Sequence, residues 1–258
     1  MKASLCHTLK LQSSGVISII GAGGKTRLMF ALANGLADKG SSVLTTTTTK
    51  IYLPDNRHHS QETIVTDSVK TLVSKSKTLL DSKKTHLSAG SATDPNRRKL
   101  IGFSPKDVDA LSQKRLFNWI VVEADGAKHK SVKASDIHEP VIPFTTTHLI
   151  LITGLDALGS PLDEDHVHRS AIFSKNTGLP LGAPLNETAL IKALTMEIKK
   201  VKKIVPESLK ILFLNKADTE NDIRSGENII KKISLRNEFH QLHVASFKNG
   251  FKLKATIP

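Results

Sequence analysis

The chain has 258 residues, which is enough for one large α/β domain or two small ones. Apolar residues make up 39% and charged residues 24%, as in soluble globular proteins, so a disordered or fibrous chain is excluded. The formal net charge of +13 suits an anionic partner, but the lysines form scattered pairs without interleaved aromatic residues, which favours solvated helix faces over a nucleic-acid-binding surface.

The only cysteine is Cys6, so the chain cannot form an internal disulfide and a reducing compartment is expected. Residues 1–15 lack the continuous apolar stretch of a signal peptide. No segment approaches the roughly 18 apolar residues that a membrane-spanning helix needs. We therefore expect a cytoplasmic protein that has no membrane partner.

Short apolar runs, which predict strands, alternate along the chain with segments whose apolar residues recur at helical spacing. Ser104 and Pro105 begin one of the helices, because serine caps a helix N-terminus and proline fits the first turn. In chain order, the predicted elements are a strand at residues 16–20, a helix at 28–40, a strand at 42–45, helices at 68–80 and 104–114, strands at 118–127 and 148–153, a helix at 186–200 and a strand at 210–218.

The predicted strands are continuous apolar runs, which is typical of strands that helices cover on both faces. We therefore expect an α/β fold in three layers, with a mostly parallel sheet flanked by helices. No repeat or linker divides the chain, so residues 1–258 are predicted to form a single domain, in which residues 53–115 are an insertion or lid. Polar residues follow each strand, at the edge where such sheets bind ligands.

The first strand leads into the sequence GAGGKT at the start of a helix. Glycines allow backbone N–H groups to converge on an anion, and the helix N-terminus adds its dipole, so we expect a phosphate loop in a P-loop NTPase-like fold. Lys25 is expected to contact the phosphates and the Thr26 hydroxyl to bind Mg²⁺; a purely structural turn is the alternative. The predicted nucleotide-binding residues of the loop are Gly21, Ala22, Gly23, Gly24, Lys25 and Thr26.

Two further strands end in residues that suit phosphoryl chemistry. Glu123 and Asp125 follow an apolar strand and are expected to bind Mg²⁺ and orient a water molecule, although acids that only meet solvent would look the same. Five threonines, residues 45–49, follow the second strand. Several should face water or ligand because buried hydroxyls need partners, and Thr46 or Thr48 is the preferred ligand contact, with half-exposed strand threonines as the alternative.

The sequence LNKAD after the last predicted strand matches the N-K-x-D pattern that reads guanine in GTPases. The carboxylate of Asp218 could accept two hydrogen bonds from guanine, which adenine cannot supply. Lys216 could pack along the base and Asn215 could brace the loop. The cofactors expected are therefore Mg²⁺ and GTP or ATP.

Histidines and carboxylates are dense around residues 138 and 166. His138 and Glu139 are expected in an extended segment, and His166, His168 and Arg169 on a short helix. The spacing does not match a zinc site. A catalytic role is assigned to His138, Glu139 and Arg169, with Arg169 stabilising phosphoryl charge; capped helices and surface charges are the alternative.

The segments GAGGKT, TTTTTKI, VVEADGAKHKSVKA, HEPVIP, GLDALGSPLDEDHVHR and LNKAD, in this order, resemble the YqeC-like family of selenium-dependent molybdenum hydroxylase accessory proteins. The resemblance extends over residues 16–218. It implies a cytoplasmic phosphate-loop protein whose partner is a molybdenum hydroxylase or the proteins that assemble its cofactor. It places the family's phosphate loop on residues 21–26 and its acidic strand end on Glu123 and Asp125.

We expect a nucleoside triphosphatase or an NTP-dependent transferase or ligase. The leading hypothesis is a Mg²⁺-dependent NTP hydrolase in which Lys25, Glu123, Asp125, Arg169 and His138 are catalytic. The first alternative is a ligase, because the contracted G-x-x-G-K-T loop resembles that of the Mur ligases and folylpolyglutamate synthetases. The second is a catalytically silent module that binds nucleic acid or protein.

Overall fold

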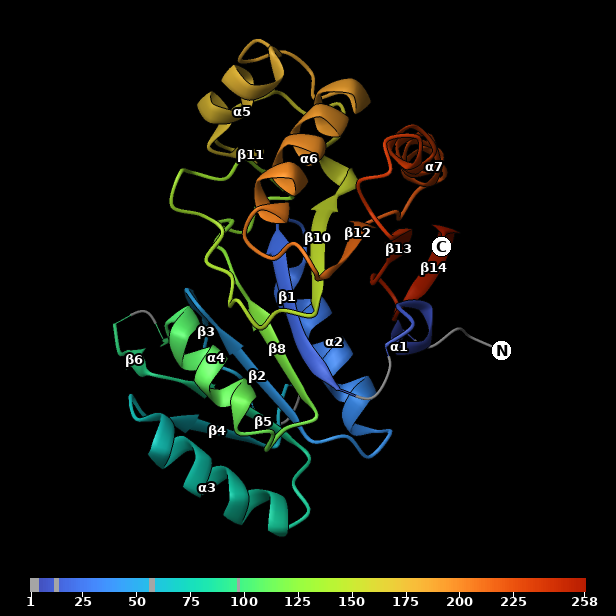
Figure 1. Cartoon of the computed structure of the whole chain (residues 1–258). Coiled ribbons are helices and arrows are strands. Elements are labelled where there is room, and N and C mark those ends of the chain that lie inside the picture. The colour runs from blue at the N-terminus through green and yellow to red at the C-terminus, as the bar shows by residue number, and fades with distance from the viewer. Residues whose placement is uncertain (1–4, 12–13, 56–58, 97) are drawn as a thin grey trace.

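The centre of the fold is β1 (Gly15–Gly21), the strand that leads into the glycine-rich loop. It lies between β8 (Trp119–Glu123) and β10 (His148–Gly154) and is parallel to both. The structure is a computed structural model that describes residues 5–11, 14–55, 59–96 and 98–258. Figure 1 shows β1, β8 and β10 side by side in the middle of the molecule.

Nine strands form the main sheet in the order β14-β13-β12-β10-β1-β8-β2-β5-β4. All neighbours are parallel except β13 and β14, so the mostly parallel α/β sheet predicted from the sequence is confirmed. The strands beyond β8 are β2 (Val43–Thr47), β5 (His86–Gly90) and β4 (Glu62–Val65), and those beyond β10 are β12 (Leu209–Asn215), β13 (Gln241–Ser246) and β14 (Lys252–Ile257).

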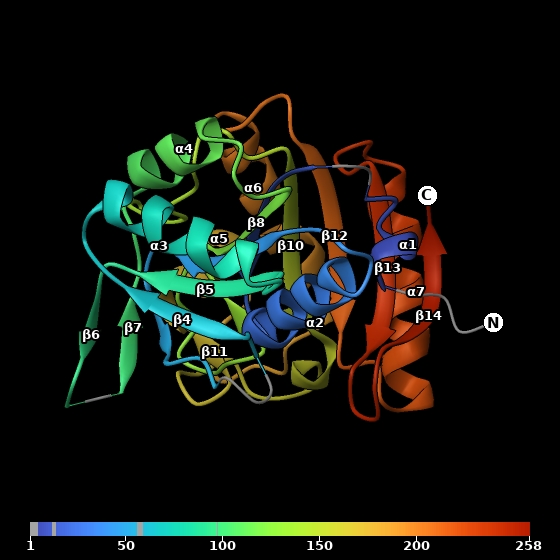
Figure 2. The same ribbon diagram turned by 90° about the horizontal axis from the view of Figure 1, so that it is seen from below.

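Helices cover both faces of this sheet, as Figures 1 and 2 show. On one face, α1 (Leu5–Thr8) and α2 (Lys25–Ala37) pack over Ile17 and Ile19 of β1. The neighbouring side chains Val16 and Ile20 point to the other face, because side chains alternate along a strand. That face is covered by α3 (Val69–Asp81), α4 (Pro105–Gln113), α6 (Glu187–Lys202) and α7 (Glu220–Ser234).

Two helix N-termini match the sequence signals that predicted them. The Ser104 hydroxyl accepts a hydrogen bond from the Asp107 N–H, and the Asp107 carboxylate accepts one from the Ser104 N–H, which makes a capping box. The side chain of Asn186 caps α6 by accepting a hydrogen bond from the N–H of Ala189. In the part of the chain that the structure describes, no helix is both long and apolar enough to cross a membrane.

Residues 53–115 contribute to two sheets. Within this range, β4 and β5 belong to the main sheet, and α3 and α4 cover it. The segment that stands apart is the pair β6 (Ala92–Asp94) and β7 (Lys99–Ile101), which joins β3 (Lys50–Tyr52) in a three-stranded antiparallel sheet. Figure 2 shows β6 and β7 projecting from one side of the molecule. A lid function for this region stays a prediction.

Candidate functional site

The loop after β1 has a backbone that only glycine adopts without strain. Gly21, Gly23 and Gly24 have φ values of 98°, 83° and 123°. A Cβ on Gly23 would lie 2.4 Å from the backbone N of Gly154, and a Cβ on Gly24 would lie 2.6 Å from the amide nitrogen of Asn215. The loop is therefore packed tightly against the ends of β10 and β12. Since α2 begins at Lys25, its positive N-terminal dipole lies at the loop.

The side chain of Lys25 turns back into this loop and is buried, with 5% of the residue exposed. Its ammonium donates a 2.6 Å hydrogen bond to the carbonyl of Gly21. The same nitrogen lies 3.1 Å from Oδ1 of Asp125 and 3.9 Å from Oε1 of Glu123. A buried cation thus stands at the N-terminus of α2 beside two carboxylates.

Thr26, Glu123 and Asp125 meet at the start of α2. The Thr26 hydroxyl donates a 2.7 Å hydrogen bond to Oε2 of Glu123. Burial raises the pKa of Glu123, and Lys25 and the Thr26 hydrogen bond offset part of that effect. Asp125 is fully buried, and its Oδ2 accepts hydrogen bonds from the Gly21 N–H at 2.8 Å and the Lys133 ammonium at 2.9 Å.

This donor set fits Mg²⁺ only when a ligand supplies further oxygens. Among the described residues, no three His, Cys, Asp or Glu side chains lie close enough to hold a metal by themselves. Protein-bound Mg²⁺ commonly takes one or two protein oxygens and completes its shell with phosphates and water. The adjacent Thr26 hydroxyl and Glu123 carboxylate are hard oxygen donors of this kind. The buried Oδ1 of Asp125 accepts no hydrogen bond and is paired only with the Lys25 ammonium, among the described residues.

A cavity of about 440 Å³ opens in front of the loop; we call it the loop pocket. Its walls come from the phosphate loop, the small β3–β7 sheet and the turn after β8. Seven of its lining side chains are lysine or arginine, against one acid, Glu123. The lining residues are Gly23, Gly24, Lys25, Thr26, Arg27, Lys50, Ile51, Tyr52, Lys99, Glu123, Gly126, Ala127, Lys128, His129, Lys130 and Lys216.

The turn after β8, which forms one wall of the loop pocket, has a strained backbone. Lys128 and His129 have φ values of 45° and 64°, in the left-handed region that residues with a Cβ rarely adopt. The His129 ring stacks on Tyr52 of β3 with 5.5 Å between centroids, and the Lys99 ammonium lies 5.2 Å from the Tyr52 ring centre. The β3–β7 sheet and the turn therefore present cations to the same space. Sequence reasoning missed all four residues.

Two residues of the LNKAD motif lie at the phosphate loop, and a third lies on the surface. The Asn215 amide donates a 2.7 Å hydrogen bond to the carbonyl of Gly23. Lys216 lines the loop pocket and donates hydrogen bonds to Ser131 at 2.6 Å and Asp156 at 2.9 Å. Asp218 is exposed, lies outside the loop pocket lining and accepts a hydrogen bond from the Ser246 hydroxyl.

The threonine run is a correction to the sequence prediction. Thr45, Thr46 and Thr47 are buried, so the expectation that several of the five face water or ligand is wrong for these three. Thr46 donates to the carbonyl of Ala89 at 2.8 Å, and Thr48 donates to that of Val141 at 2.6 Å. The hydroxyls are compatible with burial because backbone carbonyls of neighbouring segments accept their protons. Neither preferred threonine lines the loop pocket.

An ionic chain extends from Asp125 away from the loop. Lys133 donates to Asp125 and, at 2.7 Å, to Glu139. Glu139 also accepts two hydrogen bonds from the Arg169 guanidinium, at 2.6 and 3.1 Å. Burial alone would raise the pKa of Glu139, but the bonds from Arg169 and Lys133 lower it to about 2. Glu139 and Arg169 are thus linked to the loop through Lys133, a residue that no spacing pattern had singled out.

The histidines near Glu139 and Arg169 are not part of this ionic chain. The predicted short helix over residues 166–169 is wrong: Val167–His168 form β11, which pairs with β9 (Val132–Lys133). Arg169, with φ 61°, precedes α5 (Ser170–Thr177). This segment is extended because its backbone pairs with β9. His138 is exposed in a turn and makes no hydrogen bond with the rest of the described chain.

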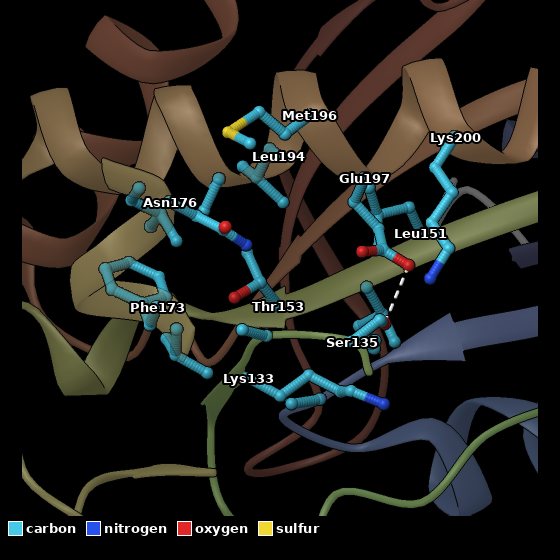
Figure 3. A pocket seen from close by; sticks show the side chains of 17 residues that line it. Lys133, Ser135, Leu151, Thr153, Phe173, Asn176, Leu194, Met196, Glu197 and Lys200 are labelled. Carbon is cyan, nitrogen blue, oxygen red and sulfur yellow. Dashed lines mark hydrogen bonds between the residues drawn. The ribbon is translucent and has the colours of Figure 1, made fainter. Parts of the chain in front are cut away.

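A second cavity of about 230 Å³ lies under α6, and we call it the α6 cavity (Figure 3). It shares no lining residue with the loop pocket, although Gly21 and Ala22 of the phosphate loop form part of its wall. Its other lining residues are Val132, Lys133, Ala134, Ser135, Leu151, Ile152, Thr153, Phe173, Asn176, Leu190, Ala193, Leu194, Met196, Glu197 and Lys200.

The chain is similar to known proteins in sequence and, more distantly, in structure. A family model described as YqeC protein matches residues 17–171. The "Uncharacterized protein YqeC" of Escherichia coli (strain K12) is 34% identical over 224 residues, which cover 82% of this chain and 80% of that protein. The structure of chloroplast FtsY from Physcomitrella patens is similar with a TM-score of 0.39 and 11% identity, over 90% of this chain and 59% of that one.

Proposed function

The chain belongs to the YqeC family, and from this and the geometry of its phosphate loop we propose that it binds a nucleoside triphosphate with Mg²⁺ and hydrolyses it. One observation carries the proposal. The buried Lys25 ammonium lies between the Gly21 carbonyl and two carboxylates, at the N-terminus of α2 and on the edge of a cation-lined cavity.

The phosphates would bind to the backbone N–H groups of residues 24–26, because the N–H groups of residues 21–23 already donate to Asp125, Ile152 and Lys130. An anion at this helix N-terminus gains the helix dipole and the Lys25 charge. The excess of lysine and arginine in the loop pocket fits the several negative charges of a triphosphate. The ligand would replace the carboxylates as the main partner of Lys25.

Thr26 and Glu123 would hold the metal, which would neutralise phosphate charge and act as a Lewis acid. Asp125 would keep the loop in place, because its buried carboxylate already binds the Gly21 N–H and Lys133. Glu123 would orient the water that attacks the terminal phosphorus. Burial raises the pKa of this carboxyl, which brings it nearer to the range of a general base.

We assign the base-reading role to Asp218, with Lys216 beside the base and Asn215 as the brace. This makes GTP the preferred nucleotide and ATP the alternative. Support comes from the Asn215 bond to Gly23 and from the position of Lys216 in the loop pocket. Asp218 would have to exchange the Ser246 hydroxyl for the base. In the cell, the proposed role is that of an accessory factor in the maturation of selenium-dependent molybdenum hydroxylases, as the family resemblance implies.

A ligase is the second candidate, and two observations favour it. The loop is the contracted G-x-x-G-K-T form, and the α6 cavity has Gly21 and Ala22 in its wall, so it offers a place for a second substrate beside the loop. In a ligase, nucleotide turnover would require that second substrate, whereas a simple hydrolase would release phosphate from GTP or ATP alone.

The deciding experiment is equilibrium binding of fluorescent GDP and ADP analogues, with and without Mg²⁺, to the native chain and to Lys25→Ala and Asp218→Ala. Lys77→Ala, which removes an exposed charge from α3, is the control. Mg²⁺-dependent GDP binding that only the first two variants lose would support the proposal. ADP preference that is indifferent to Asp218 would discard the base-reading role. Normal affinity in Lys25→Ala would refute the site.

A further inference from the structure

The α6 cavity lies on the face of the sheet opposite α2. Glu197 and Lys200 project into it from α6, and Ser135 and Lys133 rise from the segment below, as Figure 3 shows. The rest of the lining is mostly apolar and includes Leu151, Phe173 and Leu194. Asn176 of α5 and Thr153 add polar groups beside Phe173 (Figure 3). A cavity with an apolar body and a few convergent polar groups is typical of a small-molecule site.

The hydrogen bonds of the polar side chains show which groups are free for a ligand. Lys133 donates to Asp125, to the Gly126 carbonyl and to Glu139, so its three protons are used. Lys200 donates to the carbonyls of residues 136 and 139, which leaves one of its three protons. Oε1 of Glu197 accepts a 2.7 Å hydrogen bond from Ser135.

Oε2 of Glu197 has no hydrogen-bond partner within the described ranges of the chain. On α6 the cavity thus offers one carboxylate oxygen as an acceptor and one ammonium proton as a donor, and the side-chain amide of Asn176 lies across the cavity on α5. Burial raises the pKa of Glu197, although Ser135, Lys133 and Lys200 oppose the effect. A hydrogen bond to this carboxyl is stronger than one in bulk water, because the surroundings are poorly polarisable.

The charged side chains of the cavity indicate which class of ligand it can hold. A cation would meet the ammonium groups of Lys133 and Lys200, and an anion would meet the Glu197 carboxylate. We propose that the α6 cavity binds a small neutral molecule that carries an amide group, either a primary amide or the cyclic amide edge of a heterocycle. Its N–H donates to Glu197, its carbonyl accepts from Lys200, and its apolar body lies on Leu151, Phe173 and Leu194.

The occupant would also touch the phosphate loop. Gly21 and Ala22 form one wall of the cavity, and the Gly21 N–H is bound by the same Asp125 carboxylate that holds Lys133. Binding in the cavity itself does not require that the loop bind a nucleotide.

The test is a titration of the full chain with benzamide, followed by NMR of ¹³C-methyl methionine. The chain has three methionines: Met196 lines the cavity, while Met29 is a buried residue of α2, on the other face of the sheet, and serves as internal reference. We expect a saturable shift of the Met196 signal and none of Met29. Methyl benzoate has the same ring but no N–H, and we expect it to bind about fivefold more weakly.

Two variants locate the binding. Glu197→Gln replaces the charged acceptor without changing the size of the side chain, and we expect benzamide to bind about fivefold more weakly while methyl benzoate is unaffected. Ala193→Phe fills the cavity and should abolish the binding of both benzamide and methyl benzoate. The proposal is overturned if benzamide leaves Met196 unmoved, if methyl benzoate binds as well as benzamide, or if neither variant changes the titration. Because no nucleotide is present, failure here is distinct from failure of the proposed hydrolase.

Discussion

The side-chain amide of Asn215 donates a 2.7 Å hydrogen bond to the carbonyl of Gly23, across 192 positions of sequence. The bond joins the end of β12 to the loop after β1, although β10 lies between these strands. It explains why Gly24 has no room for a Cβ, since the Asn215 amide occupies that space. The shape of the phosphate loop thus depends on a strand from the last quarter of the chain.

Asn215→Ala should weaken nucleotide binding at least tenfold, because the loop loses the bond that fixes its second glycine. The free energy of unfolding should fall by about 1 kcal/mol. Asn186→Ala is the matched control: it removes the N-cap of α6, which costs about 1 kcal/mol, but leaves the loop intact. Urea denaturation and nucleotide titration of both variants check this. Equal affinities in the two variants would contradict the bracing role.

Gly23→Ala should abolish nucleotide binding, whereas Gly40→Ala should not. Both glycines have φ near 85°, so alanine is strained by about 1 kcal/mol at either position. At Gly23 the new Cβ also meets Gly154, and at Gly40 nothing lies within 4 Å. The difference in stability and nucleotide affinity between the two variants therefore reports the close contact between the loop and β10. Thermal unfolding and nucleotide titration measure these two quantities, and equal values in both variants would argue against a rigid loop.

Glu139→Gln should lower the free energy of unfolding by about 2 kcal/mol, because charged bonds to Arg169 and Lys133 are lost. The pKa of Glu139 is held at about 2, below its ordinary value near 4.5, so the folded state binds this proton less readily than the unfolded state. The difference between native and variant should be complete above pH 4.5 and shrink as the pH falls toward 2. Denaturation at several pH values tests this, with exposed Glu207→Gln as the control.

His86 should make the protein less stable in mild acid. Burial, together with nearby His59, lowers the pKa of His86 to about 4 from 6.5. Between these values the unfolded state binds more protons, so stability is full above pH 6.5 and is lost as the pH falls toward 4. The stability advantage of the native chain over His86→Gln should shrink by about 3 kcal/mol across that window. A constant difference would show that His86 titrates normally.

The sequence predicts the centre of the fold well and its edges poorly. Strands β1, β8, β10 and β12 are long apolar runs, and such runs are unambiguous when they are buried on both faces. The strand β14 alternates between exposed and partly buried residues, and β5 contains His86 and Ser88, so neither has the apolar signature. Their pairing depends on neighbours, which a single sequence does not display.

The residues of the candidate site are also partly predictable from the sequence. Residues 21–26 and Asn215 meet because β1 and β12 lie on either side of β10 and end at the same edge of the sheet, and local motifs were enough to single them out. The cations of the loop pocket come from β3, β7 and a strained turn, and only the tertiary structure brings Lys50, Lys99 and Lys128 together. The threonine run misled the prediction because backbone carbonyls satisfy its hydroxyls.

The order of the strands also bears on synthesis. A chain emerging from the ribosome carries GAGGKT before any of the other strands of the sheet, and it can build the β8–β2–β5–β4 side before the opposite side. The opposite side begins only with β10, and the amide that fixes the loop is translated 192 residues after Gly23. A nascent chain therefore holds the complete motif long before it holds the braced loop, so the proposed nucleotide binding would have to wait until β12 is made.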